Sequence, residues 1–356
     1  MRHCSGCGRR SRPPAGTEPV TQRRGGPSRT LLEADVLALL QEGRSNAEIA
    51  LALQRGVETI RTHARNIFRR LGVRTRRELS VLAGIGPIAC ATVQLLRESF
   101  ADRPAFDMAV SYALLQRVAA GELPPTLRIQ RHGPAVAFGK LDALVPGYAA
   151  ARRAAAANGF ATFERLAGGR AAVNHEGTIG LGEIVADPRA NLHIRERYAF
   201  TARVLTEALR RLDVDARVGE VAGEYCPGDF SVNARGARKL SGTAQRVVKD
   251  AAYVGTILVV RDAARVAAVV RDVYAALGVE VASETTGAVE DEAPGVTVDT
   301  VETALLAAYA AHRNLVPATR DEHTLALAAE HEPRFAAVPV IPEPATSDRG
   351  PGAPAG

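Results

Sequence analysis

Hydrophobic and polar residues follow two different patterns along this chain. Within residues 30–83, apolar side chains recur about every three or four positions, which is typical of amphipathic helices. Between residues 104 and 285, short apolar runs of strand length alternate with longer segments rich in Ala, Leu and Arg. We therefore predict an α+β protein, in which a small all-α domain at residues 30–83 precedes a mixed α/β domain at residues 104–285.

Single elements can be predicted in and around the larger domain. Strands are expected at Leu127–Gln130, Ala135–Phe138 and Thr256–Val260, and helices at Tyr148–Asn158, Tyr198–Leu212 and Ala263–Leu277. A helix is also expected at about residues 88–100, within a linker over residues 84–103, and another at Val298–His312, within a helical C-terminal extension over residues 286–335. Residues 1–29 and 336–356 are rich in Gly and Pro, which predicts a disordered basic arm and a disordered tail.

Three capping boxes mark helix starts in the N-terminal domain. In each, a Ser or Thr precedes a Glu by three positions, so the hydroxyl and the carboxylate can satisfy free backbone N–H groups. The three pairs are Thr30 with Glu33, Ser45 with Glu48 and Thr75 with Glu78. Gly43 and Gly72 fall where the first and third helices should stop.

The third predicted helix, about Val57–Leu71, separates apolar from basic side chains. Its apolar face consists of Ile60, Ala64, Ile67, Phe68 and Leu71. Its opposite face carries Arg61, Thr62, Arg65 and Arg69. Such a face can offer cations to phosphates and base edges of DNA, or it can be the solvated face of an ordinary helix, and periodicity alone leaves both interpretations open.

Charge and composition narrow the classes of protein. Residues 1–83 carry 16 basic and 7 acidic side chains, and residues 84–356 carry 29 basic and 32 acidic ones, so only the N-terminal part is suited to nucleic acid. No long uncharged apolar run and no apolar signal core occur, so we expect a cytoplasmic protein without a membrane span. Four cysteines exclude a disulfide scaffold, and Cys4 and Cys7 lack a second ligand pair, so no metal site is expected.

Lys239 and Cys226 are the candidate catalytic residues. The chain has 45 basic residues but only three lysines, Lys140, Lys239 and Lys249. Lys239 lies among glycines, and an ammonium at the end of a strand can stabilise the charge that develops on a carbonyl oxygen. Cys226 precedes Pro and Gly in a predicted turn, and a thiolate favoured by Lys239 could attack a thioester. The alternatives are a surface lysine in a hairpin and an inert structural thiol.

The N-terminal domain resembles the LuxR-type helix-turn-helix. The resemblance rests on Ser45–Ala50, Val57–His63, Asn66–Val73 and Arg77–Leu79, and the segment Gln54–Gly56 departs from the family pattern. It implies that Arg61, Thr62 and Arg65, with Arg69 on the same face, point toward DNA. It also implies that a last helix at about residues 76–83 pairs two subunits into a homodimer.

The larger domain is similar to the lipoate–protein ligase and octanoyltransferase family, which shares its fold with biotin–protein ligases. The residues that carry the similarity are Phe106–Val110, Arg165–Gly177, Arg238–Arg246 and Gly255–Val259. It implies transfer of a lipoyl or octanoyl group onto a lysine of a small lipoyl carrier domain, with Lys239 contacting the activated acyl group. The substrate-binding residues that it implies are Arg165, Gly168, Gly169, Arg170, His175, Gly242 and Thr243.

Two departures from the ligase pattern leave the chemical route open. ATP-using ligases carry three glycines where this chain has Gly168-Gly169-Arg170, and their His falls on Asn174, next to His175. The segment Tyr225–Asp229 instead resembles amidotransferase-type octanoyltransferases, in which a loop cysteine carries the acyl group. The acyl group therefore passes either through an adenylate, with ATP and magnesium, or through a thioester on Cys226.

Two functions follow for the whole chain. The first is an acyltransferase fused to a DNA-binding regulator domain. The second is a ligand-sensing transcriptional regulator whose ligase-like domain binds lipoate or acyl groups without catalysis; bifunctional biotin ligase–repressors have a similar arrangement, although with a winged helix. A packing module without DNA function is disfavoured by the net charge of +9 in residues 1–83.

Overall fold

The computed structural model describes residues 29–41, 44–71, 79 and 92–337. The chain divides into two compact units, Met1–Leu71 and Gly72–Gly356. The predicted Thr75 capping box lies outside the described residues, as do nearly all of the predicted arm, of the dimer-forming helix at residues 76–83 and of the tail.

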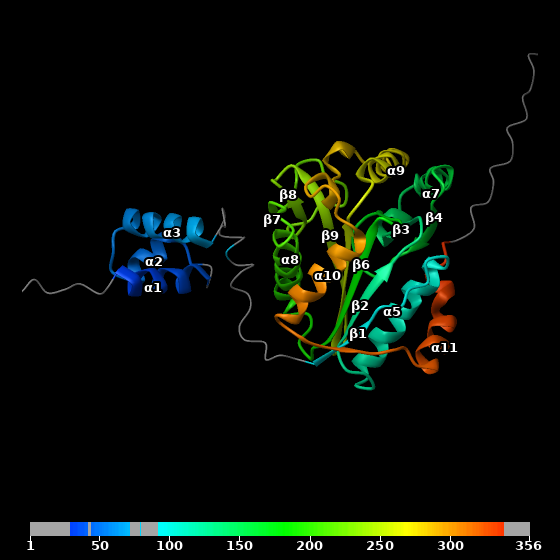
Figure 1. Cartoon of the computed structure of the whole chain (residues 1–356), viewed down its shortest axis with the longest axis horizontal. Helices are drawn as coiled ribbons and strands as arrows, with labels where there is room; N and C mark the ends of the chain where they lie inside the picture. Colours follow the sequence, from blue (N-terminus) through cyan, green and yellow to red (C-terminus); the bar gives the residue numbers. More distant parts are fainter. Residues whose placement is uncertain (1–28, 42–43, 72–78, 80–91, 338–356) are drawn as a thin grey trace, which may run out of the picture. The chain divides into compact units, whose positions relative to one another are not determined.

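The described residues of the first unit form three helices: α1 (Arg29–Gln41), α2 (Asn46–Ala52) and α3 (Val57–Leu71) (Figure 1). The capping box at Ser45 is confirmed, because Ser45 Oγ accepts a hydrogen bond from the N–H of Glu48 and Glu48 Oε2 accepts one from the N–H of Ser45. Helix α1 begins at Arg29, one residue before the expected cap at Thr30, and the side chain of Thr30 lies outside the described residues, so this capping box stays a prediction.

Helix α3 has the two faces that the sequence predicted. Ile60, Ala64 and Ile67 are buried, together with Val36 of α1 and Ile49 of α2, so the apolar face forms the core of this unit. The four polar candidates, Arg61, Thr62, Arg65 and Arg69, are all exposed. The unit therefore presents a basic helix surface over a packed apolar interior.

The second unit is built on an eight-stranded mixed sheet. Its strands are β1 (Thr92–Leu96), β2 (Thr126–Arg131), β6 (Thr178–Ala186), β7 (Ala216–Val218), β8 (Val232–Ala234), β9 (Arg238–Val248), β10 (Ala251–Val259) and β11 (Asn314–Pro317). Their order is β11-β1-β2-β6-β10-β9-β8-β7. The β11, β1 and β2 strands run parallel, whereas each remaining neighbour pair is antiparallel.

The helix expected at about residues 88–100 is wrong. Residues 92–96 form β1, which pairs with both β2 and β11. The apolar run there is short, and such a run fits a buried strand as well as a helix turn, so only the pairing partners decide. One of these partners, β11, lies within residues 286–335, which are thus not purely helical.

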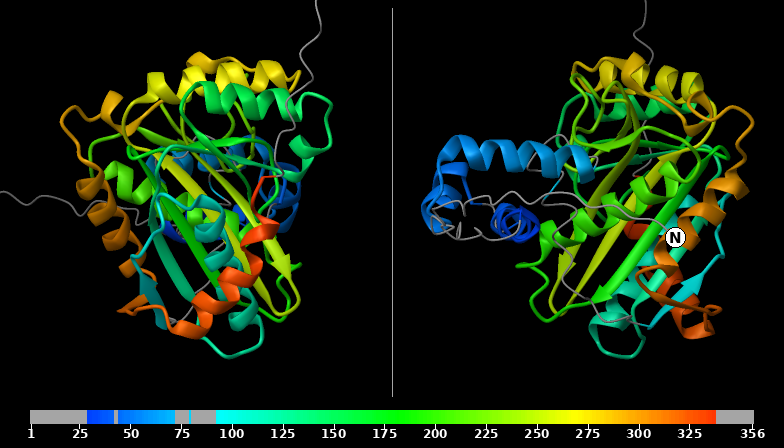
Figure 2. Two further views of the ribbon diagram at one scale, coloured as in Figure 1. Left: turned by 90° about the vertical axis from the view of Figure 1, so that its right-hand side faces the viewer. Right: turned by 60° about the vertical axis from the view of Figure 1, so that its left-hand side comes forward.

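Helices cover both faces of the large sheet (Figure 2). Helices α8 (Ile194–Arg210) and α10 (Val298–Ala310) pack on the face that carries Leu127 and Leu181. Helix α5 (Pro104–Ala119), with α11 (Glu322–His331) against it, packs on the face that carries Ile184 and Tyr253. The strand residues alternate between the two faces, as a period of two requires.

A smaller sheet completes the unit. It consists of β4 (Ala161–Glu164), β3 (Ala135–Phe138) and β5 (Ala172–Asn174), and helices α7 (Tyr148–Ala157) and α9 (Ala263–Ala276) share an apolar core with it. The remaining short helices are α6 (Lys140–Ala143), η1 (Ser283–Thr285), η2 (Val289–Asp291) and η3 (Glu332–Arg334). The predicted strand at residues 135–138 is confirmed as β3. The predicted helices are confirmed as α7, α8, α9 and α10, apart from a few residues at their ends.

The N-terminus of α11 gives an acid-sensitive contribution to stability. Asp321 caps the helix through the N–H of Thr324 and accepts hydrogen bonds from Arg117 Nη1 on both carboxylate oxygens. The bond from Arg117 lowers the pKa of Asp321 from its ordinary value of 3.8 to about 2. A carboxyl whose pKa is lowered by folding stabilises the fold above its ordinary pKa, and this stabilisation is lost as the pH falls through about 2.

We predict that Asp321→Asn lowers the free energy of unfolding at neutral pH by less than about 1 kcal/mol, because the carboxylate is half exposed and screened. The difference from the parent protein should shrink as the pH falls toward 2 and vanish below it. Chemical denaturation at several pH values measures it, with Glu322→Gln at the exposed neighbouring position as the control for a general charge effect. A difference that is independent of pH would contradict the assignment.

Candidate functional site

A cavity of about 390 Å³ lies beside β9 and the loop that joins β7 to β8. It is lined by Arg165, Gly168, Gly169, Ala172, Ile194, Arg195, Tyr198, Tyr225, Cys226, Pro227, Gly228, Asp229, Phe230, Ser231, Lys239, Gly242, Thr243, Ala244 and Ile257. The cavity thus brings together both predicted catalytic residues and five of the seven predicted substrate-binding residues, although they come from distant parts of the sequence.

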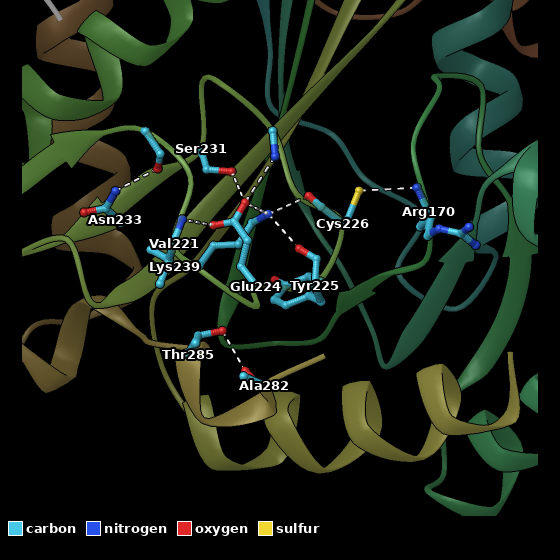
Figure 3. A network of polar contacts seen from close by, with 12 residues as sticks. Arg170, Val221, Glu224, Tyr225, Cys226, Ser231, Asn233, Lys239, Ala282 and Thr285 are labelled. Carbon is cyan, nitrogen blue, oxygen red and sulfur yellow. Dashed lines mark hydrogen bonds and ion pairs between the residues drawn. The ribbon is translucent and has the colours of Figure 1, made fainter. Parts of the chain in front are cut away.

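Lys239 is the second residue of β9, and only 2% of its side chain is exposed. Its Nζ lies 3.0 Å from Glu224 Oε1, 2.8 Å from the carbonyl oxygen of Tyr225 and 2.7 Å from that of Cys226 (Figure 3). An ammonium has three protons to donate, so all three are directed at this loop. The alternative of a surface lysine in a hairpin is therefore excluded.

Cys226 lies in the loop with a φ of +43°, a left-handed conformation that is uncommon for a residue with a side chain. Its Sγ accepts hydrogen bonds from the backbone N–H of Arg170 at 3.3 Å and from Nη2 of Arg165 at 3.5 Å. We expected Lys239 to favour the thiolate. In the structure the sulfur faces the N–H of Arg170 (Figure 3) and the guanidinium of Arg165, and the lysine donates to the carbonyl oxygens on either side of the Cys226 Cα.

Gly169 allows the segment Gly168–Arg170 to approach the loop that carries Cys226. It has a φ of +90°, and a Cβ at this position would lie 2.2 Å from Arg165 Nη2 and 3.0 Å from Cys226 Sγ. A side chain would therefore push the guanidinium or the sulfur out of place. At Gly168 a Cβ would meet nothing within 4 Å, so there is room for a side chain at Gly168 but not at Gly169.

We predict that Gly169→Ala lowers the free energy of unfolding by about 1–3 kcal/mol and the rate of any reaction at Cys226 by at least about tenfold. The left-handed backbone and the collision with Arg165 Nη2 cause both effects. Gly168→Ala is the matched control for stability and should stay within about 0.5 kcal/mol of the parent protein. Denaturant titration gives the stabilities, and equal losses at the two positions would contradict the steric argument.

The sequence did not single out Glu224, which is the most highly bonded side chain of the site. Its side chain is fully buried and accepts hydrogen bonds from the N–H of Val221, the N–H of Gly228, Ser231 Oγ and Lys239 Nζ. The available signal was the position of an acidic residue two places before Cys226, in a loop rich in glycine. That signal is weak, because most acidic residues in such loops are exposed.

Two of the predicted substrate-binding residues do not line the main cavity. Arg170 contributes its backbone N–H to Cys226, and its guanidinium lies 3.4 Å from Asp142, whose pKa is raised by burial. His175 is fully buried at the start of a turn, where its Nδ1 accepts the N–H of Gly177, and burial lowers its pKa. Its side chain therefore stabilises the turn before β6.

A smaller inner cavity of about 50 Å³ adjoins the main one. The two share Arg165, Ala172, Ala244 and Ile257, and the inner one extends to Asn174 and His132. Within the main cavity, the rings of Tyr198 and Phe230 stack with centroids 5.3 Å apart. Burial raises the pKa of Tyr198, so its hydroxyl stays protonated at neutral pH. The space is thus narrow, largely apolar and bounded by the thiol.

Two kinds of feature are absent from the described residues. Within that part of the chain, His, Cys, Asp and Glu side chains form no group of three that could hold a metal ion. None of its helices has both the length and the apolar composition that a bilayer span needs.

Models of known families match both units. Residues 103–310 match the model of the lipoyl protein ligase A/B catalytic domain. Residues 30–83 match the model of the bacterial regulatory proteins of the luxR family. These matches confirm both resemblances and the predicted fold class.

Curated relatives and solved structures agree with the larger match. An octanoyl-[GcvH]:protein N-octanoyltransferase from Anoxybacillus flavithermus is 30% identical over 150 residues, which are 41% of this chain and 54% of that protein. The chain thus spans about half the length of the curated relatives that it matches.

The larger unit also has the fold of several solved structures. Lipoate-protein ligase A bound with ATP covers 68% of this chain and 95% of its own, with a TM-score of 0.55 and 21% identity. A Thermoplasma acidophilum protein with bound lipoic acid covers the same shares, with a TM-score of 0.56 and 21% identity.

Proposed function

Because the chain belongs to the lipoyl protein ligase A/B catalytic domain family, we propose that it transfers an octanoyl or lipoyl group to a lysine of a lipoyl carrier domain through a thioester on Cys226. One observation carries the proposal. The thiol of Cys226 lies in the same cavity as Lys239 and accepts hydrogen bonds from Arg165 and from the N–H of Arg170.

The proposed reaction has two halves. In the first, the Cys226 thiolate attacks the carbonyl carbon of the acyl group on a donor carrier protein, a thioester forms, and the donor's leaving group departs with a proton. In the second, the uncharged amine of the acceptor lysine attacks the thioester, an amide forms, and the thiol is released with the amine's proton. The N–H of Arg170 lies 3.3 Å from Sγ, and we propose that it donates to the oxyanion that forms in each half.

The acyl chain has a place beside the thiol. We propose that its carbonyl lies near Cys226 and that its hydrocarbon part follows the apolar wall of Tyr198, Phe230 and Ile257. The inner cavity beyond Ile257 would receive the distal end of the chain. Burial of such a chain would supply most of the binding energy.

A nucleotide-dependent route finds less support in these residues. The resemblance to ATP-using ligases requires a third glycine where this chain has Arg170. Here the N–H of Arg170 is bonded to Cys226 Sγ and its guanidinium faces Asp142. This segment is engaged with the thiol, so we propose no step through an adenylate.

One experiment compares the two routes directly. Purified full-length protein is mixed with an apo lipoyl-domain acceptor and either octanoyl carrier protein or octanoate with ATP and magnesium, and all proteins are followed by intact mass. The proposal requires an octanoyl adduct on Cys226 and acceptor modification with the first donor. Acceptor modification only with octanoate and ATP would overturn it.

A second function is proposed for the N-terminal unit. We propose that it binds DNA and that the whole chain couples acyl transfer to transcription. The match of residues 30–83 to the luxR family and the exposed basic face of α3 support this role. On that face, Arg61 is paired with Glu58 and Arg69 with Asn66, which leaves Arg65 as the strongest candidate for contact with DNA.

We predict that Arg65→Ala weakens DNA binding by about 1–3 kcal/mol, which is roughly 5- to 150-fold in Kd, because a cation in contact with base edges or phosphate is lost. Gel retardation on the chain's own promoter region at low salt measures the effect. The control is Arg153→Ala, an exposed arginine of α7 that changes the net charge equally. Equal binding by the two variants would contradict a role for Arg65.

A further inference from the structure

We propose that Glu224 is the positioning residue of this site: through Lys239 it fixes the backbone of Cys226 and thereby the direction of the thiol. The proposal rests on the proposed role of Cys226 as the acyl carrier. It assigns Lys239, in this state, to holding the loop of residues 219–231.

Glu224 connects both sides of the Cys226 loop to the sheet. Its Oε2 accepts the N–H of Val221 at 3.0 Å, before the cysteine. Its Oε1 accepts the N–H of Gly228 at 3.2 Å and the hydroxyl of Ser231 at 2.5 Å, after the cysteine, and also Lys239 Nζ of β9 at 3.0 Å. One buried carboxylate therefore ties three points of the loop and one strand together (Figure 3).

Lys239 carries this constraint to Cys226. The carbonyl oxygens of Tyr225 and Cys226 belong to the two peptide groups that flank the Cα of Cys226. Both accept hydrogen bonds from the same ammonium, at 2.8 and 2.7 Å. Fixing two successive peptide groups fixes φ and ψ of the residue between them. This explains how Cys226 keeps its φ of +43°, which costs about 1–2 kcal/mol in an unsupported chain.

The direction of the thiol follows from that backbone. With φ and ψ fixed, the Cα–Cβ bond points toward the segment of Gly168–Arg170, where Sγ meets the N–H of Arg170 and the guanidinium of Arg165. In a relaxed conformation the Cβ would leave this direction. The carboxylate also neutralises the ammonium, which has only 2% of its side chain exposed. Glu224 thus acts on the thiol without touching it.

The test uses the full chain and three variants. Glu224→Gln removes the charge with little change of shape. Ser231→Ala removes one of the loop's bonds to Glu224 and leaves the ion pair with Lys239. Glu220→Gln, at an exposed acidic position in the same loop, is the matched control. Each is measured for its unfolding midpoint, for single-turnover acylation of Cys226 by octanoyl carrier protein, for kcat and KM, and for hydrogen exchange of the amides in residues 219–231.

We expect Glu224→Gln to acylate Cys226 at least about 30-fold more slowly at a temperature where it is fully folded, because small displacements of a nucleophile have effects of this size. The loss should fall on kcat, with KM within about threefold of the parent protein. Ser231→Ala should lose a smaller factor, about three- to tenfold, and Glu220→Gln none.

Acylation by folded Glu224→Gln within twofold of the control would overturn the proposal, even if its unfolding midpoint falls. If Glu224→Gln does not fold, Ser231→Ala decides by the same criterion. If the parent protein itself forms no adduct, the proposed function has failed. Amide hydrogen exchange then tests the role of Glu224 in the loop independently of acylation. Faster exchange across residues 219–231 in Glu224→Gln supports the proposal that Glu224 positions the loop, and unchanged exchange overturns it.

Discussion

Replacing Cys226 by Ser is expected to lower the rate of acyl transfer by about 10³-fold or more. A serine hydroxyl that has no general base beside it is a far weaker nucleophile than a thiolate. Among the described residues, the donors to the Cys226 sulfur are Arg165 and the N–H of Arg170, and neither is a general base. The transferred group is followed by intact mass on a lipoyl-domain acceptor. The octanoyl adduct on the enzyme should disappear at the same time.

The control for this variant is Cys90→Ser, which removes another thiol of the chain and should keep the activity. Retention of transfer by Cys226→Ser with octanoate and ATP would show an adenylate route. Retention with octanoyl carrier protein would show direct transfer between the two carriers. Either outcome contradicts the thioester on Cys226.

Replacing Lys239 by Met is expected to lower the free energy of unfolding by about 3–5 kcal/mol, because it leaves a buried carboxylate without its partner. The side chains of Glu224 and Lys239 are 0% and 2% exposed, so water cannot replace the lost ammonium. Three hydrogen bonds to the loop disappear with it. Denaturant titration measures the change, and Lys249→Met, at one of the other two lysines and exposed, is the matched control.

The double variant Lys239→Met with Glu224→Gln separates charge from packing. It removes both buried charges, so it should recover about half or more of the stability that the single variant loses. A single variant as stable as Lys249→Met would show that the ion pair does not support the loop.

The sequence predicted the elements whose pattern is local. Helix α3 is an example, because its apolar face depends only on the spacing of Ile60, Ala64 and Ile67, and the structure has the same bounds, Val57–Leu71. The candidate site was also accessible in part. The scarce lysine and the glycine-rich segments pointed to one cavity, which Lys239, Gly169 and Cys226 do line.

What the sequence could not give depends on contacts between distant segments. The apolar run at residues 92–96 is a strand only because β2 and β11 lie on either side of it. One of the two donors to the Cys226 thiol is the N–H of Arg170, 56 positions away, and a backbone N–H cannot be recognised from the residue type. Asn174 and His175 are adjacent in the sequence, but only Asn174, the last residue of β5, lines the inner cavity. The sequence alone does not show which of the two side chains faces the cavity.

The pairing of β11 with β1 affects when the large sheet can form during synthesis and which fragments of the chain can fold. Thr92 and Asn314 lie side by side although 222 positions separate them, so the eight-stranded sheet cannot be completed until the chain has been synthesised through β11. Contacts of such long range slow folding. A fragment that ends before Asn314 would leave β1 with an open row of N–H and C=O groups and a tendency to self-associate. Expression fragments of this unit should therefore extend at least through Pro317.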